Sequence, residues 1–193
     1  MQEQEFSPKE SLRVINEMIE TSKSRINEDG FIYLFWGWLI LFCAIAQFVL
    51  FQVELYEYNY IPYLIVIPAG IYTGFRQYKK HKKERSNYVT NVMKSLWISL
   101  GINLVVFGFL MFSAYQVSPT PFILVLLSIG AIVSGGTVKF NALIYGGIIC
   151  NIIAIGALFT PSVYQPLLLA AGMISADLVP GYIIRKKYKK AYA

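Results

Sequence analysis

The sequence predicts an all-α polytopic membrane protein, with a bundle of six transmembrane helices in three hairpins and an N-terminal cytoplasmic amphipathic helix. Of its 193 residues, 56% are hydrophobic and only 15% are charged, against about 45–50% and about 25% in ordinary soluble domains. The charges are confined to short stretches that separate long charge-free runs. This composition excludes a disordered chain, a fibrous protein and an ordinary soluble domain.

Residues 1–30 predict the amphipathic helix. Ser7 is suited to the N-cap, Pro8 to the first helical position and Glu10 to closing a capping box. Four apolar residues then recur on one helical face: Leu12, Ile15, Ile19 and Ile26. Because the segment opens with acidic residues and has no apolar run, we expect no signal peptide. The helix is expected to lie against the bundle or the lipid headgroups, or to dock a partner helix.

Four charge-free runs define the transmembrane domain, residues 31–185. They cover residues 31–53, 58–75, 95–138 and 140–176. A hydrocarbon core of about 30 Å needs about 20 apolar residues per helix, so the last two runs each hold two spans. Proline-containing segments at 118–121 and 160–162 supply the turns. The predicted spans lie near 31–53, 60–77, 95–116, 120–138, 141–160 and 164–185, ahead of a basic cytoplasmic tail at 186–193.

The distribution of cations predicts the orientation of these spans. All 17 Lys and Arg residues lie in four places. These are the N-terminal segment, the stretch around the link between spans two and three, the link between spans four and five, and the C-terminus. The other three connections contain no Lys or Arg. Since cytoplasmic loops carry the excess of basic residues, both termini are predicted to be cytoplasmic.

The three predicted hairpins are weakly similar to one another. Each even-numbered span begins near a proline, carries a glycine near its middle and ends in a cation. Glycine and proline are common in membrane helices, so chance competes with a true threefold repeat. The sequence leaves both explanations open.

Glycines predict where helices approach one another closely. Gly70 and Gly74 form a small-xxx-small pattern in span two, which permits close helix packing. Five more glycines thin the inner ends of spans four and five: Gly130, Gly135, Gly136, Gly146 and Gly147. Packing is their expected role, with a hinge or a pore constriction as the alternative.

The residue patterns of membrane-embedded enzymes are missing from the sequence. Intramembrane serine proteolysis needs a Ser–His pair at depth, but the one histidine, His81, lies in a basic loop. Aspartyl chemistry needs two carboxylates that share a site, and Asp177 is the only carboxylate within a predicted span. We therefore predict no enzyme activity, no cofactor and no metal site. Cys43 and Cys150 are expected to be buried and inert.

Asp177 is the residue that most strongly suggests a site, because an ionisable group within a span is costly. At 1.5 Å per residue it lies about 12 Å above the inner boundary, level with Asn103, while Asn151 lies about 15 Å up. The three side chains predict a polar intramembrane layer, and Pro180 can loosen the helix beside it. Two interpretations stay open: a site for a cation, a proton or an uncharged solute, or hydrogen bonds that hold the bundle together.

The link between spans two and three carries a basic surface for lipid or a partner. Its cations are Lys79, Lys80, Lys82, Lys83 and Arg85, in a basic loop at residues 79–85. Beside a membrane helix such a run fixes topology and binds anionic lipid headgroups, so we expect no nucleic-acid binding. Residues 1–30 carry a net charge of −3 and residues 76–94 one of +6. These charges favour attraction between the two segments.

Three stretches of the chain carry a resemblance to known proteins. They are Trp36-Gly37-Trp38, residues 134–147, which begin Ser134-Gly135-Gly136, and residues 179–188, which begin Val179-Pro180-Gly181. In these motifs the chain resembles a family of small, uncharacterised six-span bacterial inner-membrane proteins, over nearly its whole length. The resemblance implies the topology and a bacterial inner (cytoplasmic) membrane. It implies no activity and no catalytic residues, and it does not include Asp177.

Two functions are compatible with this sequence. The first is a non-enzymatic integral membrane protein that acts by interaction or regulation, with the cytoplasmic helix and the basic loop as its surface for a cytoplasmic protein partner. The alternative is a small transporter or channel for an ion or small solute that uses the polar layer around Asp177. The apolar interior of the spans favours the first, because the second needs a hydrated path. A homo-oligomer, with a path at its centre, would supply one.

Overall fold

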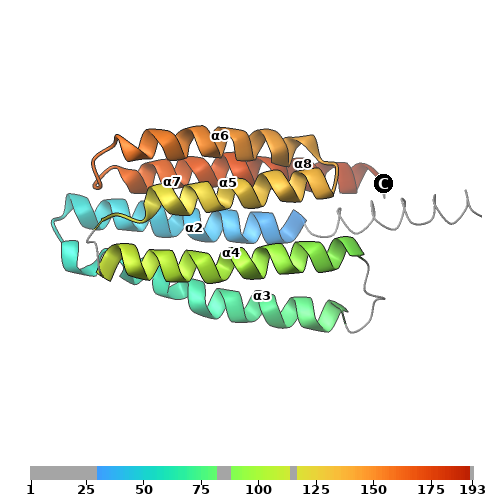
Figure 1. The fold of residues 1–193 in the computed structure, drawn as a ribbon, viewed down its shortest axis with the longest axis horizontal. Coiled ribbons are helices and arrows are strands. Elements are labelled where there is room, and N and C mark those ends of the chain that lie inside the picture. Colours follow the sequence, from blue (N-terminus) through green and yellow to red (C-terminus); the bar gives the residue numbers. More distant parts are fainter. Residues whose placement is uncertain (1–29, 82–87, 114–116, 192–193) are drawn as a thin grey trace, which may run out of the picture.

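The described part of the protein consists of helices joined by turns and short links. A computed structural model describes residues 30–81, 88–113 and 117–191, and these form helices and turns with no strands (Figure 1). Five helices are long and apolar enough to cross a membrane: residues 30–52, 91–111, 120–137, 141–158 and 165–187. This confirms the all-α class and agrees with a membrane protein. The predicted amphipathic helix lies outside the described residues, except for Gly30, where α2 begins.

The described helices follow the charge-free runs of the sequence. The first half of the chain forms α2 (Gly30–Gln52), the short 3₁₀ turns η1 (Tyr56–Tyr58) and η2 (Ile61–Ile65), α3 (Val66–His81) and α4 (Tyr88–Ser113). The second half forms α5 (Thr120–Thr137), α6 (Asn141–Leu158), α7 (Gln165–Met173), the π-helical turn η3 (Ile174–Leu178) and α8 (Val179–Ala191). Because α7, η3 and α8 are continuous, they make up the last span.

The second predicted span, at 60–77, is not among the five long apolar helices. Its residues are divided between η2 and α3, and α3 has only 16 residues. Pro68 explains where α3 starts: within a longer α-helix its ring would clash with the carbonyl of Leu64 and it could not donate a hydrogen bond to it. The helix therefore begins at Val66, after a 3₁₀ turn that contains Pro62.

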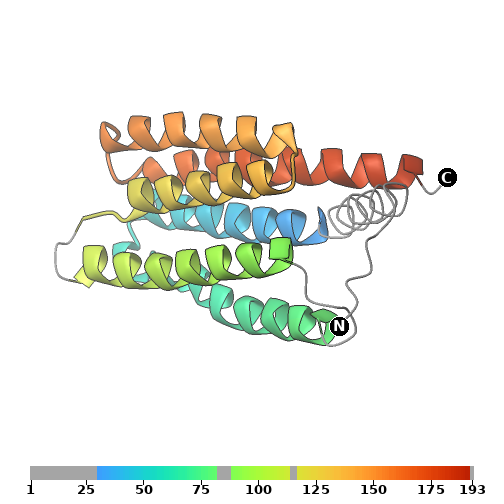
Figure 2. The same cartoon turned by 45° about the vertical axis from the view of Figure 1, so that its right-hand side comes forward.

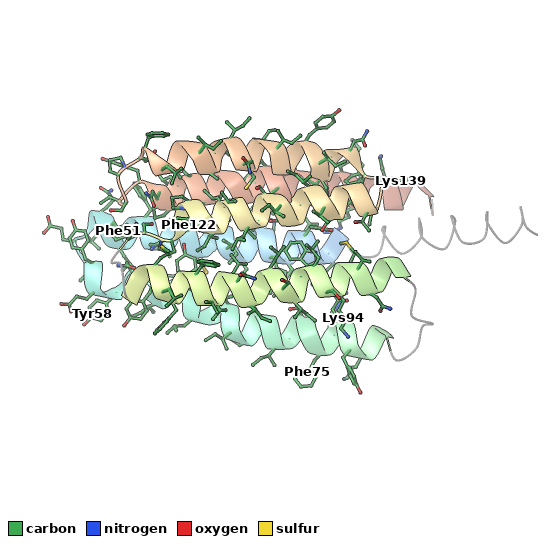
Figure 3. All side chains as sticks on the ribbon, viewed as in Figure 1. Phe51, Tyr58, Phe75, Lys94, Phe122 and Lys139 are labelled. Carbon is green, nitrogen blue, oxygen red and sulfur yellow. The ribbon has the colours of Figure 1, made fainter. Side chains whose placement is uncertain are left out.

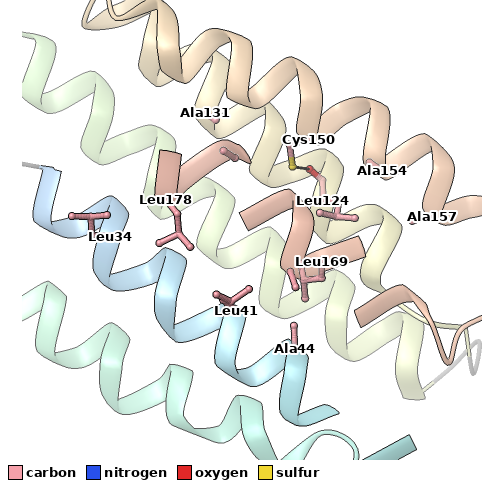
Figure 4. Packing of buried hydrophobic residues seen from close by; sticks show 12 residues of the cluster. Leu34, Leu41, Ala44, Leu124, Ala131, Cys150, Ala154, Ala157, Leu169 and Leu178 are labelled. Atoms are coloured by element: carbon pink, nitrogen blue, oxygen red, sulfur yellow. Dashed lines mark hydrogen bonds between the residues drawn. The ribbon is translucent and has the colours of Figure 1, made fainter. Parts of the chain in front are cut away.

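Four elements pack into a compact body, which we define as α2, α5, α6 and the continuous α7–η3–α8. The last of these is central, because it contacts α2, α5 and α6 (Figures 1 and 2). The tightest pair is α5 and α6, which belong to two different predicted hairpins. The buried apolar cluster comes only from the body (Figure 4): Leu34, Leu41, Ala44, Leu124, Ala131, Cys150, Ala154, Ala157, Leu169, Ala170, Ala176 and Leu178.

The other two helices, α3 and α4, form what we call the α3–α4 arm. They run next to each other in Figures 1 and 2, yet in the described part of the chain they scarcely contact each other. Each is attached separately to the body. Near its end, α3 places the Arg76 guanidinium 4.1 Å from the centre of the Phe31 ring of α2. In α4, Leu100 and Trp97 pack against Gly130 of α5.

The segment before α3 is also tied to α2 by polar contacts. The Cys43 thiol donates a hydrogen bond to the Pro62 carbonyl at 3.1 Å. The Tyr63 hydroxyl donates to the Gln47 side-chain oxygen at 2.9 Å. These two bonds hold η2 against the far end of α2, so that α3 is fixed at both of its ends.

The two ends of the bundle differ in composition. Figure 3 shows Lys94 and Lys139 at one end, which we call the basic end, and Phe51 and Tyr58 at the other. The C-terminal part of α8 also lies at the basic end, where the Lys187 ammonium is 5.1 Å from the centre of the Phe140 ring. Cations that gather at one end of an apolar bundle are typical of the cytoplasmic side of a membrane protein.

Candidate functional site

Asp177 lies in the π-helical turn η3, in the middle of the last span. Its side chain is buried, at 6% exposure. Pro180 accounts for the wide turn, because it has no N–H to donate to the Ala176 carbonyl and its ring would clash with that carbonyl in an α-helix. The Val179 N–H donates instead to the Ile174 carbonyl, five residues back. Such π turns within α-helices are frequent at functional sites.

The π turn also frees a backbone carbonyl. In an α-helix the Ser175 carbonyl would accept from the Val179 N–H, which here bonds to Ile174. The next donor along the chain would be Pro180, which has no N–H. The Ser175 carbonyl points instead at Gly146 of α6, so closely that a Cβ built on that glycine would overlap the carbonyl oxygen. The absence of a side chain at residue 146 is therefore what lets α6 approach the turn.

Glycines also let α2 and α5 pack closely against the last span at and before the π turn. A Cβ built on Gly37 would lie 2.7 Å from the Leu178 side chain and 3.2 Å from the Asp177 Cβ. One turn earlier, a Cβ on Gly172 would overlap the side chain of Leu124. Asp177 is thus surrounded by close helix contacts. Within the described residues its carboxylate has no hydrogen bond and no ion pair.

The structure does not join the predicted polar layer into one site. The Asn151 amide donates at 3.0 Å to the Ser128 hydroxyl, between α6 and α5. The Asn103 amide donates at 2.8 Å to the Ser99 carbonyl, within α4, and the main contact of α4 is with α5. In the described part of the chain neither amide is hydrogen-bonded to Asp177. Counting residues predicts the depth of a side chain but not the direction in which it points, and here the directions differ.

Two buried polar atoms were not anticipated from the sequence. The Ser134 hydroxyl and the Gln165 side-chain oxygen are buried and have no hydrogen-bond partner among the described residues. Gly135 contacts Leu143 and Ile144, and Gly146 contacts the turn that holds Asp177. Close contacts with α6 therefore lie next to Ser134 in α5 and next to Asp177 in the last span.

Gln165 has a structural role that the sequence signals only weakly. Its amide nitrogen donates to the carbonyls of Ala157 at 3.1 Å and Thr160 at 3.0 Å. The Ala157 carbonyl belongs to the last turn of α6, where backbone acceptors have no helical partner, and Thr160 lies in the turn that follows. A glutamine directly after a turn that contains proline is the one sequence feature that could have indicated this cap.

The basic surface can be placed only through its neighbours. Lys79 is exposed at the end of α3. Lys80 lies in α3, and Lys82, Lys83 and Arg85 lie outside the described residues.

Cys43 and Cys150 are both free and buried, as the sequence predicts. The described residues contain no group of three or more side chains that could hold a metal ion. A comparison of the chain with known protein families, curated proteins and solved structures finds no match.

Proposed function

We propose that this chain is a non-enzymatic integral protein of a bacterial inner membrane, with six spans and both termini in the cytoplasm, that acts by interaction or regulation. The length of η2 and α3 supports the sixth span. Five residues at about 2.0 Å each and 16 at about 1.5 Å each give about 34 Å, enough to cross a hydrocarbon core of about 30 Å. The cations of the basic end support the orientation.

One observation carries the interaction function: the body is closed around its buried polar groups, whereas the arm that carries the basic loop is left open. Between residues 91 and 111 of α4, Leu100 is the only buried residue. In the part of the chain that the structure describes, no atom lies within 4 Å of a Cβ built on Gly70 or Gly74 of α3. An arm that contacts the body at a few points and leaves most of its surface exposed is suited to presenting a surface, and the closed body supplies a rigid support.

The partner surface is the basic loop at residues 79–85 together with the acidic amphipathic segment at residues 1–30. A cytoplasmic protein with an acidic face would be attracted to the loop, and this attraction would weaken as salt is raised. A helical partner would add contacts with the apolar face of the N-terminal segment.

A pair of exposed tyrosines at the basic end provides a matched test. Tyr78 lies in α3 next to the basic loop, and Tyr145 lies in α6 on the body, with exposures of 68% and 64%. A photo-cross-linking amino acid at each position, in cells, should join one discrete protein to residue 78 and none to residue 145. Neutralising the basic loop should abolish the adduct. Equal adducts at both positions, or lipid adducts alone, would overturn the proposal.

A second function is favoured by one specific feature, the π turn at Asp177. A buried carboxylate beside a freed backbone carbonyl is the kind of arrangement that transporters use for ions. Flux of protons and of monovalent cations into proteoliposomes should then be measurable with the wild type and lost with Asp177→Asn. Absence of flux with both proteins would leave the interaction function alone.

A further inference from the structure

The carboxyl group of Asp177 is packed tightly among described residues that do not bond to it. The turn η3, which holds Asp177, packs against α2, α5 and α6. On the side of α2, a Cβ built on Gly37 would lie 3.2 Å from the Asp177 Cβ, and on the side of α6 the backbone of Gly146 lies against the Ser175 carbonyl. At 6% exposure, Asp177 has neither an ion pair nor a hydrogen bond within the described residues.

The elements packed against Asp177 place no positive charge beside it. Neither α5 nor α7 contains a titratable side chain. The others carry phenols and thiols, which are neutral in water near neutral pH: Tyr33, Cys43, Tyr145, Cys150, Tyr182 and Tyr188. The buried Cys150 thiol is close enough to interact electrostatically with Asp177, but it donates its hydrogen bond to the Leu124 carbonyl at 3.6 Å. The first cation of α8 is Arg185, which is exposed and lies eight residues, about 12 Å, beyond Asp177.

The surroundings of Asp177 also lack the shell of oxygen atoms that a metal cation requires. A cation within a membrane protein is held by several oxygen ligands that replace its hydration shell. The Ser175 carbonyl is covered by Gly146, and the Ser175 hydroxyl donates to the Gly172 carbonyl at 2.9 Å. Asn151 donates from α6 to α5. Within the described residues, no second carboxylate joins Asp177 to complete such a shell.

We propose that Asp177 is a proton-binding site: in the closed body its carboxyl group holds a proton as a neutral acid, and the ion that this site takes is a proton and not a metal cation. A proton needs one carboxyl oxygen and no shell of ligands, so it fits these surroundings. An unpaired carboxylate in the same place would be costly. This identity of the ion deepens the second of the two functions proposed above, and its part in transport rests on that function.

The close contacts at Gly37 and Gly146 link the proton to the packing of the body. Loss of the proton would place a negative charge between α2, η3 and α6. Such a charge is stabilised by water, which the close packing at these two glycines excludes. Release of the proton therefore favours separation of these helices, and binding of the proton favours the closed body.

The test is infrared spectroscopy of the full-length protein in a neutral detergent that has no ester carbonyl. At about pH 6, exposed Asp and Glu side chains are ionised, since their pKa values are about 4. A protonated carboxyl group has a separate carbonyl stretching band, which shifts in heavy water. The wild type should show this band, and Asp177→Asn should lose it. Asp177→Glu, which keeps the acid, should show the band at a shifted frequency and serves as the test if the Asn variant does not fold.

Glu57→Gln is the matched control, because Glu57 is an exposed carboxylate in η1, and it should leave the band unchanged. Absence of the band in the wild type, or an equal band in folded Asp177→Asn, would overturn the proposal. A band that disappears when sodium or potassium is added at constant pH would overturn it in favour of a metal cation. A band that withstands both salts supports the proton.

Proton flux into proteoliposomes separates the proton site from the transport function. A band at Asp177 without proton flux would support the proton site and contradict transport. Flux of sodium or potassium that is lost with Asp177→Asn, in a protein without the band, would support transport and overturn the proton site.

Discussion

Most glycines of the body and the described glycines of the α3–α4 arm lie in opposite surroundings. Eight of the ten body glycines lie so close to neighbouring atoms that a Cβ could be added only if those atoms moved: Gly30, Gly37, Gly130, Gly135, Gly146, Gly147, Gly172 and Gly181. The other two, Gly136 and Gly156, have no described atom within 4 Å of such a Cβ. In the arm, none of the four described glycines has a neighbour within 4 Å of such a Cβ: Gly70, Gly74, Gly101 and Gly108. Glycine thus allows close helix packing at most of its positions in the body, whereas in the arm the described glycines have no described neighbour close to them.

This difference shows which contacts stabilise the packing of helices in each region. Between helices in lipid there is no hydrophobic driving force, so close van der Waals contact has to supply the attraction. The body obtains it where helix backbones meet at glycine, as at Gly146 and the Ser175 carbonyl. The arm has no such contacts of its own and depends on side chains at a few points, such as Leu100 against Gly130.

The largest effect is expected from adding one methyl group to the body, at Gly146. Gly146→Ala places its Cβ on the Ser175 carbonyl oxygen, and a backbone atom cannot turn aside as the end of a side chain can. We expect a loss of about 2–3 kcal/mol in unfolding free energy, measured by thermal unfolding in detergent. Gly156→Ala, in the same helix with nothing within 4 Å, is the control and should be neutral or slightly stabilising. Equal losses would show that α6 tolerates no alanine anywhere.

A smaller and more local effect is expected where α4 meets the body. Leu100 is buried against α5, whereas Ile102, two residues further along, is 60% exposed. Leu100→Ala should cost about 2 kcal/mol and raise amide hydrogen exchange in α4 while exchange in α6 and α7 stays slow. Ile102→Ala should change neither. If exchange rises in the body as much as in α4, then α4 is part of the body and the distinction between the two regions is wrong.

The sequence predicts the fold where a single local rule decides it. Charge-free runs predict the extent of the helices, because charges are costly in a hydrocarbon core. Prolines mark helix starts, because a first-turn N–H has no helical partner to lose. For this reason α5 starts at Thr120 and α6 at Asn141, close to where the sequence places them. The second span departs from prediction because Pro62 and Pro68 act on backbone geometry, which an apolar run does not reveal.

The candidate site is less predictable, because it depends on rotation and on neighbours. Pro180 indicates a disturbed helix, but not that the disturbance is a π turn at residues 174–178. Asn103 shares its predicted depth with Asp177, but it bonds within its own helix. The pattern of Gly70 and Gly74 indicates that close approach is permitted, yet among the described residues no helix approaches it. A sequence pattern describes one surface, whereas packing needs two.

The smallest change in unfolding free energy is expected for a substitution at Gly74. It is also the most direct test of the difference between the arm and the body. Because no described residue has an atom within 4 Å of a Cβ at this position, Gly74→Ala should leave the unfolding free energy in detergent unchanged or raise it by about 0.5–1 kcal/mol. The same measurement in bilayers made from native lipid should give a different result if that face of the arm is covered in the membrane. A loss of stability in bilayers alone would mean that a lipid or a partner lies against Gly74. A loss in both media would mean that α3 packs through its glycines within the chain, which would remove the contrast between the arm and the body.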